Sequence, residues 1–331
     1  TQAGAFAELH VEYEDGSKDV IATDETWSVK TGEIRYSEIY MGETIDTDAP
    51  EITEGNVVVK DFDKAVLTAQ ENEPVSITEK IAGKELIVTP KGEKLVDFGQ
   101  IVTGVVEVHV NGEKGQKIVL HHAEVLDKDG NFYPETLRQA KSIDTFICNG
   151  EEQIFRPHFT FHGFRYISVE GMEEFTADQF FACVTHSDME KTGDFHCSNK
   201  KVNQLQSNIT WSQRDNFLDI PTDCPQRDER LGWTGDAQVF SWTAAFNRNT
   251  VLFYTKWMRD VAAESSLEKG VPHVVPDILE SYSSSAWSDA AVIVPWVVYQ
   301  IYGDKGILEE NWKCMHEWVD YIKNNCEENG L

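Results

Sequence analysis

Residues 223–236 carry the residue types with the clearest chemical potential, and we call them the signature segment. They bring four carboxylates, two arginines and one tryptophan into a turn-rich connection. Hydrolysis of a glycosidic bond needs one carboxylic acid that protonates the departing oxygen and another carboxylate that activates water. An aromatic face suits the apolar side of a sugar ring. The segment therefore predicts a sugar site, although a clearly separate second catalytic carboxylate is missing from it.

The carboxylates of the signature segment have structural as well as chemical interpretations. Asp223 follows Pro221, and it either organises the turn there or accepts hydrogen bonds from sugar hydroxyls. Asp228 and Glu229 are adjacent, so their side chains point to different sides and only one can serve as the acid. An acid that works near neutral pH needs a raised pKa, through burial or through the neighbouring Asp223 and Asp236.

The arginines and aromatic residues also leave alternatives open. Arg227 either contacts a ligand or forms a structural salt bridge, and for Arg230 the salt bridge is favoured. Trp233, between two glycines, is either a wall for the methyl group of a deoxy sugar or a core residue. Trp287 opens an apolar helical pattern, which favours core packing. Asp236 is expected to be the N-cap of the next helix.

The signature segment resembles the signature of bacterial α-L-rhamnosidases, and further matches extend over most of the chain. These are VDFGQ at residues 96–100, HAE at 122–124, FTFHGFRY at 159–166, WSDA at 287–290, PW at 295–296 and YGD at 302–304. The resemblance implies an inverting glycoside hydrolase in which β-sandwich domains precede an (α/α)6 barrel. It also implies a rhamnose-containing glycoside or polysaccharide as the substrate.

The resemblance also assigns roles to individual residues. Glu229 aligns with the general acid of the family, and no metal or cofactor takes part. The carboxylate that activates water comes from a later barrel helix in the family, so we expect it beyond Leu331 and expect residues 1–331 alone to show no turnover. The resemblance implies that five residues bind rhamnose: Asp223, Arg227, Trp233, Asp236 and Trp287.

Two other functions fit the residues themselves. An acidic loop with arginines and tryptophans also suits another helical-barrel glycosidase or lyase that acts on a different sugar. From a different class, the chain fits a non-catalytic carbohydrate-binding fragment. Loss of sugar binding on removal of Trp233 would place the site in the helical part, whereas binding by residues 1–190 alone would favour the binding module.

Composition excludes several classes of partner. The formal net charge of -28 argues against binding to nucleic acid or to anionic membrane surfaces, because both are bound through positively charged surfaces. No apolar run reaches the roughly 18 residues of a membrane helix. The six cysteines have irregular spacing, which predicts free thiols. Assembly as a homo-oligomer stays open, and the compartment is unknown, with a bacterial cytoplasm or periplasm expected from the resemblance.

The first part of the chain has the pattern of antiparallel β-sandwich domains. Residues 1–190 alternate between apolar and polar side chains, with turn signals between the runs. The acidic and poorly patterned residues 47–61 suggest a domain boundary. We therefore predict the C-terminal part of a β-sandwich domain over 1–61 and a second β-sandwich domain over 62–190.

The pattern becomes helical after Cys197. Ser198 is a plausible N-cap for a helix that Pro221 ends, and four further helices are expected. The last two of these should cover residues 287–302 and 305–325. Residues 191–331 thus predict the first part of a six-hairpin (α/α)6 barrel. With five helices where the complete barrel has twelve, this barrel would be incomplete.

Overall fold

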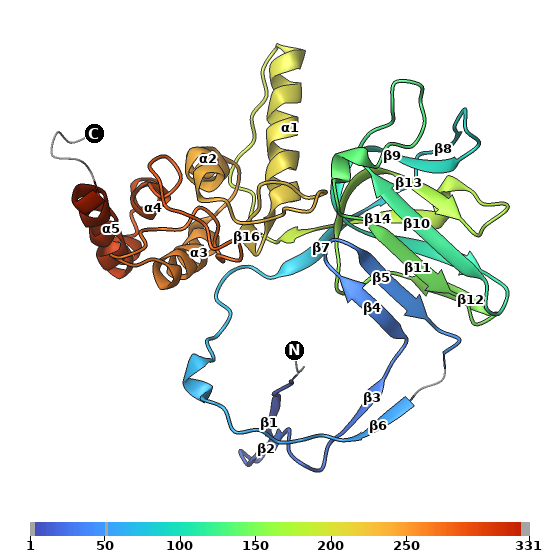
Figure 1. Cartoon of the computed structure of the whole chain (residues 1–331), viewed down its shortest axis with the longest axis horizontal. Helices are drawn as coiled ribbons and strands as arrows, with labels where there is room; N and C mark the ends of the chain where they lie inside the picture. Colours follow the sequence, from blue (N-terminus) through green and yellow to red (C-terminus); the bar gives the residue numbers. More distant parts are fainter. Residues whose placement is uncertain (1–3, 50–51, 326–331) are drawn as a thin grey trace.

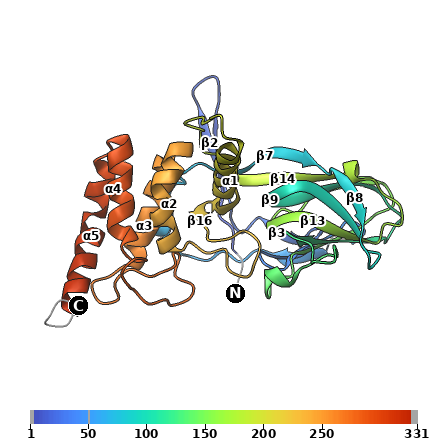
Figure 2. The ribbon, with the colours of Figure 1, turned by 90° about the horizontal axis from the view of Figure 1, so that it is seen from above.

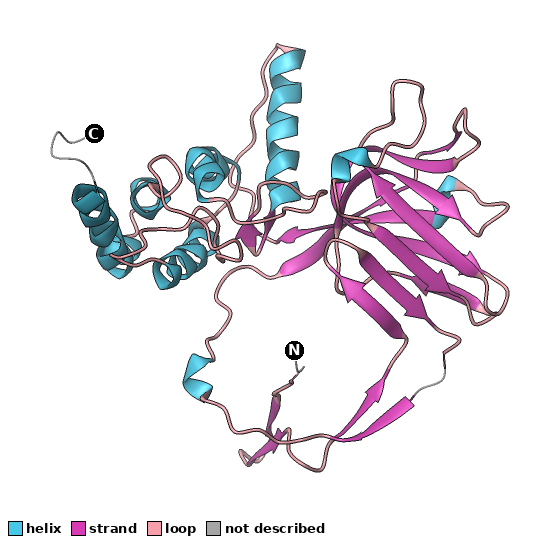
Figure 3. Cartoon of the chain, viewed as in Figure 1, coloured by secondary structure: helices cyan, strands magenta, loops and turns pink. Residues whose placement is uncertain are grey.

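The computed structural model describes residues 4–49 and 52–325. Within them, strands dominate up to Ser187 and every α-helix lies after residue 199 (Figure 1, Figure 3). The predicted order of a β part and a helical part is therefore confirmed. The β part also contains three 3₁₀ helices, which are η1 (Lys64–Val66), η2 (Glu135–Leu137) and η3 (Ala177–Gln179).

The first strands form two small antiparallel sheets apart from the main sheet (Figure 1). One pairs β1 (Glu8–Glu12) with β2 (Lys18–Ala22), and the other pairs β3 (Ser28–Thr31) with β6 (Ile52–Asn56). Apolar side chains of the first pair, such as Leu9 and Val20, are exposed. An isolated two-stranded hairpin is marginally stable, because it buries little apolar surface.

The main sheet has ten strands, in the order β4-β5-β11-β10-β13-β9-β14-β7, with β8 and β12 also paired to β9. Its strands are β4 (Ile34–Glu38), β5 (Gly42–Asp46), β7 (Val75–Ala82), β8 (Glu85–Val88), β9 (Lys94–Asn111), β10 (Lys117–Ala123), β11 (Ile143–Ile147), β12 (Glu152–Phe155), β13 (His162–Glu170) and β14 (Phe180–Ser187). Buried residues such as Val106, Phe146 and Phe164 form its core.

The expectation of a purely antiparallel sheet was wrong at one pair, because β5 runs parallel to β11. Parallel neighbours need a long connection, and the chain between Asp46 and Ile143 supplies one. The sheet also takes strands from both sides of residue 61, since β4 and β5 precede it and the other strands follow it. The domain boundary at residue 61 stays a prediction.

The helical part contains the five predicted helices, with different ends. They are α1 (Lys200–Asn216), α2 (Thr234–Asn247), α3 (Val251–Glu264), α4 (Ala290–Tyr302) and α5 (Gly306–Asn325), and the short strands β15 (Phe217–Leu218) and β16 (Ile220–Pro221) follow α1. Asn199, not Ser198, caps α1, because its side chain accepts from the N–H of Lys201. Trp287 precedes α4 instead of opening it. Gly303 ends α4 in the left-handed conformation, with a φ of 72°.

Helix α1 bridges the two parts of the molecule. It lies against β9 and β14 on one side, and Gln213 donates a hydrogen bond to the carbonyl of Ala244 in α2 on the other. Helices α2 to α5 then succeed one another away from the sheet (Figure 2) and share a core that includes Trp257 and Trp318. Helices α2 to α5 are therefore held together by one apolar core, and hydrogen bonds join α1 to α2.

Two sequence-based expectations concern the chain as a whole. No helix among the described residues combines the length and the apolar character that crossing a membrane requires. The described cysteines are free thiols, as expected, while Cys326 lies outside the described residues. They are Cys148, Cys183, Cys197, Cys224 and Cys314.

Candidate active site

The signature segment connects β16 to α2, and Arg230 fastens it to the β part. Arg230 is buried and has a positive φ of 52°, and burial lowers the pKa of its guanidinium to about 10. The expected salt bridge was wrong, because the hydrogen-bond partners of this side chain among the described residues are uncharged. They are the carbonyl oxygens of Ile39, Phe161, Gln226 and Arg227 and the hydroxyl group of Ser142.

Arg227 joins two of the predicted site carboxylates. Its Nη2 lies 2.9 Å from Oδ2 of Asp223, and its Nε lies 2.7 Å from Oε2 of Glu229. The other oxygen of Asp223 accepts a hydrogen bond from the N–H of Leu231 at 3.0 Å. Asp223 thus has both oxygens engaged and also holds the turn of the segment. The two interpretations of Asp223, as turn organiser and as site residue, are therefore compatible.

The two carboxylate oxygens of Glu229 differ in their contacts with the described residues. Arg138 also reaches Oε2, with its Nη1 at 3.1 Å, so that two arginines converge on the same atom. Among the described residues, Oε1 has no hydrogen-bond donor. The hydroxyl of Tyr40 donates to the backbone carbonyl of Glu229 at 2.7 Å and holds the main chain. Oε1 is therefore the oxygen that can carry a proton towards a ligand.

The expected rise in the pKa of Glu229 was wrong for this structure. Burial raises the pKa of this carboxyl group, but the hydrogen bond and charge of Arg227, together with Arg138, outweigh it and hold the pKa below its ordinary value. Asp223 shows the opposite balance, because burial raises its pKa more than Leu231 and Arg227 lower it. Glu229 is therefore ionised at neutral pH while no ligand excludes water from it.

A cavity of about 510 Å³ adjoins this cluster and brings three predicted site residues together: Asp223, Asp236 and Trp287. The N-cap assignment of Asp236 was wrong, because Trp233 occupies that position and Asp236 lies in the first turn of α2. Partial burial raises the pKa of Asp236, and the charge of Glu229 adds to the rise. The cavity thus combines an aromatic side chain with carboxylates.

Trp287 lies in the loop before α4, not in a helix core. It is 40% exposed, and its indole ring packs so closely on Gly235 that a Cβ there would lie 2.9 Å from ring atoms. His273, which sequence reasoning missed, approaches the same ring, with 5.6 Å between the centroids. An indole ring that is partly exposed and held in place by packing on Gly235 can contact the apolar face of a sugar.

Trp233 is placed differently from Trp287. Its backbone pairs with Val274, its indole N–H is buried, and no hydrogen-bond partner for that group occurs among the described residues. Trp233 does not line the cavity beside Trp287. Its role as a wall therefore stays a prediction.

Comparison with known protein families finds matches along nearly the whole chain. Residues 1–79 match the alpha-L-rhamnosidase N-terminal domain, and residues 87–186 match the bacterial alpha-L-rhamnosidase concanavalin-like domain. Residues 190–330 match the bacterial alpha-L-rhamnosidase 6 hairpin glycosidase domain. The chain belongs to the bacterial α-L-rhamnosidase family.

Individual relatives of the rhamnosidase family show the extent of the likeness. The chain is 40% identical to an alpha-L-rhamnosidase of Formosa agariphila, over 95% of the chain and 36% of the relative. The solved structure of Streptomyces avermitilis alpha-L-rhamnosidase complexed with L-rhamnose is similar with a TM-score of 0.92 and 34% identity, over 97% of this chain and 33% of that one. Native rhamnosidase from Aspergillus terreus gives a TM-score of 0.90 and 39% identity, over 95% of this chain and 38% of that one. The chain thus spans about a third of the length of these relatives.

The sequence analysis did not identify two residues of the β part that contact Glu229 in the signature segment of this rhamnosidase-family chain. Tyr40 and Arg138 contact Glu229 from 189 and 91 residues away along the chain. No local spacing relates them to the signature segment. Arg138 follows η2 in the connection between β10 and β11. A single arginine in such a connection looks like an ordinary surface residue in the sequence.

Two groups of side chains in this rhamnosidase-family chain have the spacing of metal ligands. Asp223, Cys224 and Glu229 place ligand atoms within 4.8 Å of one another. Burial raises the pKa of the Cys224 thiol to about 12, which disfavours the thiolate that a metal needs. Arg227 already forms ion pairs with both carboxylates, and its positive charge opposes a cation there. This group therefore fits a cation poorly.

The second group is His122, Asp144 and His162, which are fully buried in the main sheet. Glu124 lies near His122 in sequence, but the companions of His122 in this group come from β11 and β13. His122 donates through Nδ1 to the carbonyl of Ser142, which leaves Nε2 as an acceptor 3.7 Å from Asp144. Burial and the nearby charge of Arg230 lower the pKa of His162. That charge also opposes a cation, and the absence of a metal stays a prediction.

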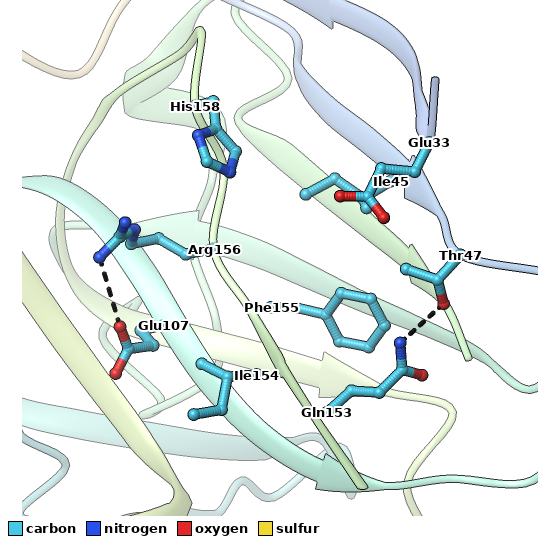
Figure 4. A pocket seen from close by; sticks show the side chains of 9 residues that line it. All are labelled: Glu33, Ile45, Thr47, Glu107, Gln153, Ile154, Phe155, Arg156 and His158. Carbon is cyan, nitrogen blue, oxygen red and sulfur yellow. Dashed lines mark hydrogen bonds and ion pairs between the residues drawn. The ribbon is translucent and has the colours of Figure 1, made fainter. Parts of the chain in front are cut away.

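Another cavity of about 460 Å³ lies over β12 and contains none of the signature residues (Figure 4). In it, Arg156 pairs with Glu107 at 3.5 Å, and Gln153 donates to the hydroxyl of Thr47 at 2.8 Å. Neither pair contacts Glu229 or Asp223. The candidate active site is therefore the cavity beside α2 together with the Asp223, Arg227 and Glu229 cluster.

Proposed function

We propose that the whole protein removes terminal α-L-rhamnose from glycosides or polysaccharides by an inverting acid/base mechanism. The observation that carries the proposal is the arrangement of Glu229, whose Oε2 is held by two arginines while Oε1 accepts no hydrogen bond from the described residues. The names of the relatives and the L-rhamnose complex of the Streptomyces avermitilis enzyme support rhamnose as the sugar. They favour it over another helical-barrel glycosidase, a lyase or a binding module.

In this mechanism Glu229 protonates the glycosidic oxygen through Oε1. Sugar binding replaces water around the carboxyl group with a neutral ligand, and this desolvation favours the protonated form. Glu229 is thus ionised in the free protein and gains its proton in the complex. The residues that bind rhamnose in this proposal are Asp223, Arg227, Trp233, Asp236 and Trp287.

The base belongs to another part of the whole protein in this proposal. Inverting enzymes separate their two carboxyl groups by about 6.5 to 9.5 Å to admit water. Asp223 is directly bridged to Glu229 by Arg227, and both its oxygens already accept hydrogen bonds. We further propose that the main sheet is a β-sandwich and that the helical part is an incomplete (α/α)6 barrel. In this proposal the base is a carboxylate of a later barrel helix of the whole protein.

The stereochemistry of the first product tests the proposed reaction. We expect the whole protein to release β-L-rhamnose from a natural α-L-rhamnoside, because water attacks from the face opposite the leaving group. Proton NMR during the first minutes would show the β-anomeric signal before mutarotation produces the α-anomer. Initial appearance of α-L-rhamnose would contradict the inverting mechanism, and an inert α-L-rhamnoside would contradict the proposed substrate.

Gly235→Ala tests the wall role of Trp287. The new methyl group would displace the indole ring, and we expect KM for an aryl α-L-rhamnoside to rise on the order of tenfold, as for loss of a modest apolar contact. Displacing the ring costs stability, and the higher helix propensity of alanine offsets part of that cost, so the melting temperature is measured together with KM. Gly32→Ala is the matched control, since no atom lies within 4 Å of a Cβ there. An unchanged KM in a folded Gly235→Ala variant would remove Trp287 from the site.

A further inference from the structure

Arg138 belongs to the β part, yet its guanidinium meets the proposed acid of the helical part. Its Nη1 lies 3.1 Å from Oε2 of Glu229 and 3.9 Å from Oδ1 of Asp228. The residues around it in the connection are anchored, since Leu137 and Ala140 are 1% and 5% exposed. The guanidinium of Arg138 therefore extends towards the signature segment from a backbone that its buried neighbours hold in place.

The backbone at Arg138 indicates a constrained position. Its φ is 58°, in a region that non-glycine residues seldom adopt, and its N–H closes η2 by donating to the carbonyl of Glu135. Such a conformation persists only where the surrounding structure holds it, and it occurs preferentially at functional sites. Here the unusual backbone directs a 56% exposed side chain onto Glu229 instead of leaving it free in solvent.

Both arginine contacts of Glu229 fall on the same oxygen. Arg227 and Arg138 both donate to Oε2, one from within the signature segment and one from the β part. Tyr40, also from the β part, fixes the carbonyl of the same residue. A carboxyl group held at one oxygen by two cations carries its proton on the other oxygen. Rotation that would exchange the two oxygens breaks both charged hydrogen bonds.

We infer that Arg138 is a positioning residue for Glu229, which fixes Oε2 so that Oε1 presents the proton to the glycosidic oxygen. This inference rests on the proposed role of Glu229 as the acid. It means that the β part completes the catalytic site of the helical part. The competing interpretation is an exposed ion pair of little consequence, which is the usual outcome for such pairs.

The first test compares rates in the whole protein. Arg138→Gln should lower kcat on a natural α-L-rhamnoside by about 10- to 100-fold, as expected for a misplaced catalytic group. KM should change little, and an aryl rhamnoside with an activated leaving group should lose less rate because it needs less protonation. Arg138→Lys should recover part of the loss. Arg156→Gln is the control, because Arg156 also pairs with a carboxylate but lies in the cavity of Figure 4.

The pH profile separates positioning from general structural support. Burial raises the pKa of Glu229 and the two arginines lower it, so removing the charge of Arg138 must raise it. Since the acid works only when protonated, the alkaline limb of kcat/KM should move to higher pH in Arg138→Gln. It should stay closer to the wild-type position in Arg138→Lys, which keeps the charge.

A double variant distinguishes failure of this inference from failure of the proposed function. If Arg138 acts through Glu229, adding Arg138→Gln to Glu229→Gln should cause little further loss on natural substrates. Wild-type rates and an unmoved alkaline limb in Arg138→Gln would overturn the positioning role, and so would equal losses on both substrates with a lower melting temperature. Full activity of Glu229→Gln alone would instead overturn the proposed acid.

Discussion

Glu229→Gln should abolish practical turnover of natural α-L-rhamnosides by the whole protein while it preserves rhamnose binding. The amide keeps the shape of the side chain but has no acidic proton, and loss of general acid catalysis typically costs 10²- to 10⁴-fold in rate. Rhamnose binding should survive, because Asp223, Asp236 and Trp287 line the cavity and Glu229 is not among its lining residues. Isothermal titration with L-rhamnose and hydrolysis assays on the same preparation measure the two effects separately.

Glu317→Gln is a control for Glu229→Gln, because Glu317 lies on α5 near Lys313 and far along the chain from the signature segment. It should retain wild-type rates. Loss of rhamnose binding together with activity in Glu229→Gln would mean that the substitution disturbed the cavity. In that case the rate loss would not identify the acid.

Arg230→Met should have the largest effect on stability, a loss of about 3 to 5 kcal/mol, because it leaves several buried acceptors without a donor. Arg230 is 4% exposed and hydrogen-bonds to carbonyl oxygens on both sides of the contact between the β part and the signature segment. Methionine fills much of the space but donates nothing. The melting temperature of the variant, measured by circular dichroism, should fall clearly below that of the wild type.

Arg35→Met is the matched control for Arg230→Met. Arg35 is exposed and donates one hydrogen bond, to the carbonyl of Gly32. Its removal should change the melting temperature very little. Similar melting temperatures for the two variants would contradict the view that Arg230 fastens the signature segment to the β part.

Local sequence predicted the parts of the site that are close in sequence. Asp223, Arg227 and Glu229 lie within one short segment, so that an arginine between two carboxylates was foreseeable as an ion-pair partner, and the structure joins all three. Helical periodicity likewise predicted α1 to α5. The ends were less accurate, because Trp287 and its neighbours look helical but pack as a loop beside Gly235.

The properties that depend on distant contacts were not predictable. The pKa of Glu229 was expected to rise through burial or through Asp223 and Asp236. Arg227 and then Arg138 lower it instead, and Arg138 comes from the β part. The parallel pairing of β5 with β11 also arises only when the early strands join the sheet. Sequence spacing does not encode such contacts, because the residues that make them are far apart along the chain and meet only in the folded protein.

The dependence of rate on the leaving group tests the central claim most directly. It requires a series of aryl α-L-rhamnosides with phenols of decreasing acidity, and the variants Glu229→Gln and Asp223→Asn of the whole protein. If Glu229 is the acid, the rate of Glu229→Gln should fall steeply as the phenol becomes a poorer leaving group. The wild type and Asp223→Asn should show a shallow dependence. A steep dependence in Asp223→Asn with a shallow one in Glu229→Gln would contradict the account and assign the proton to Asp223, whose pKa burial raises.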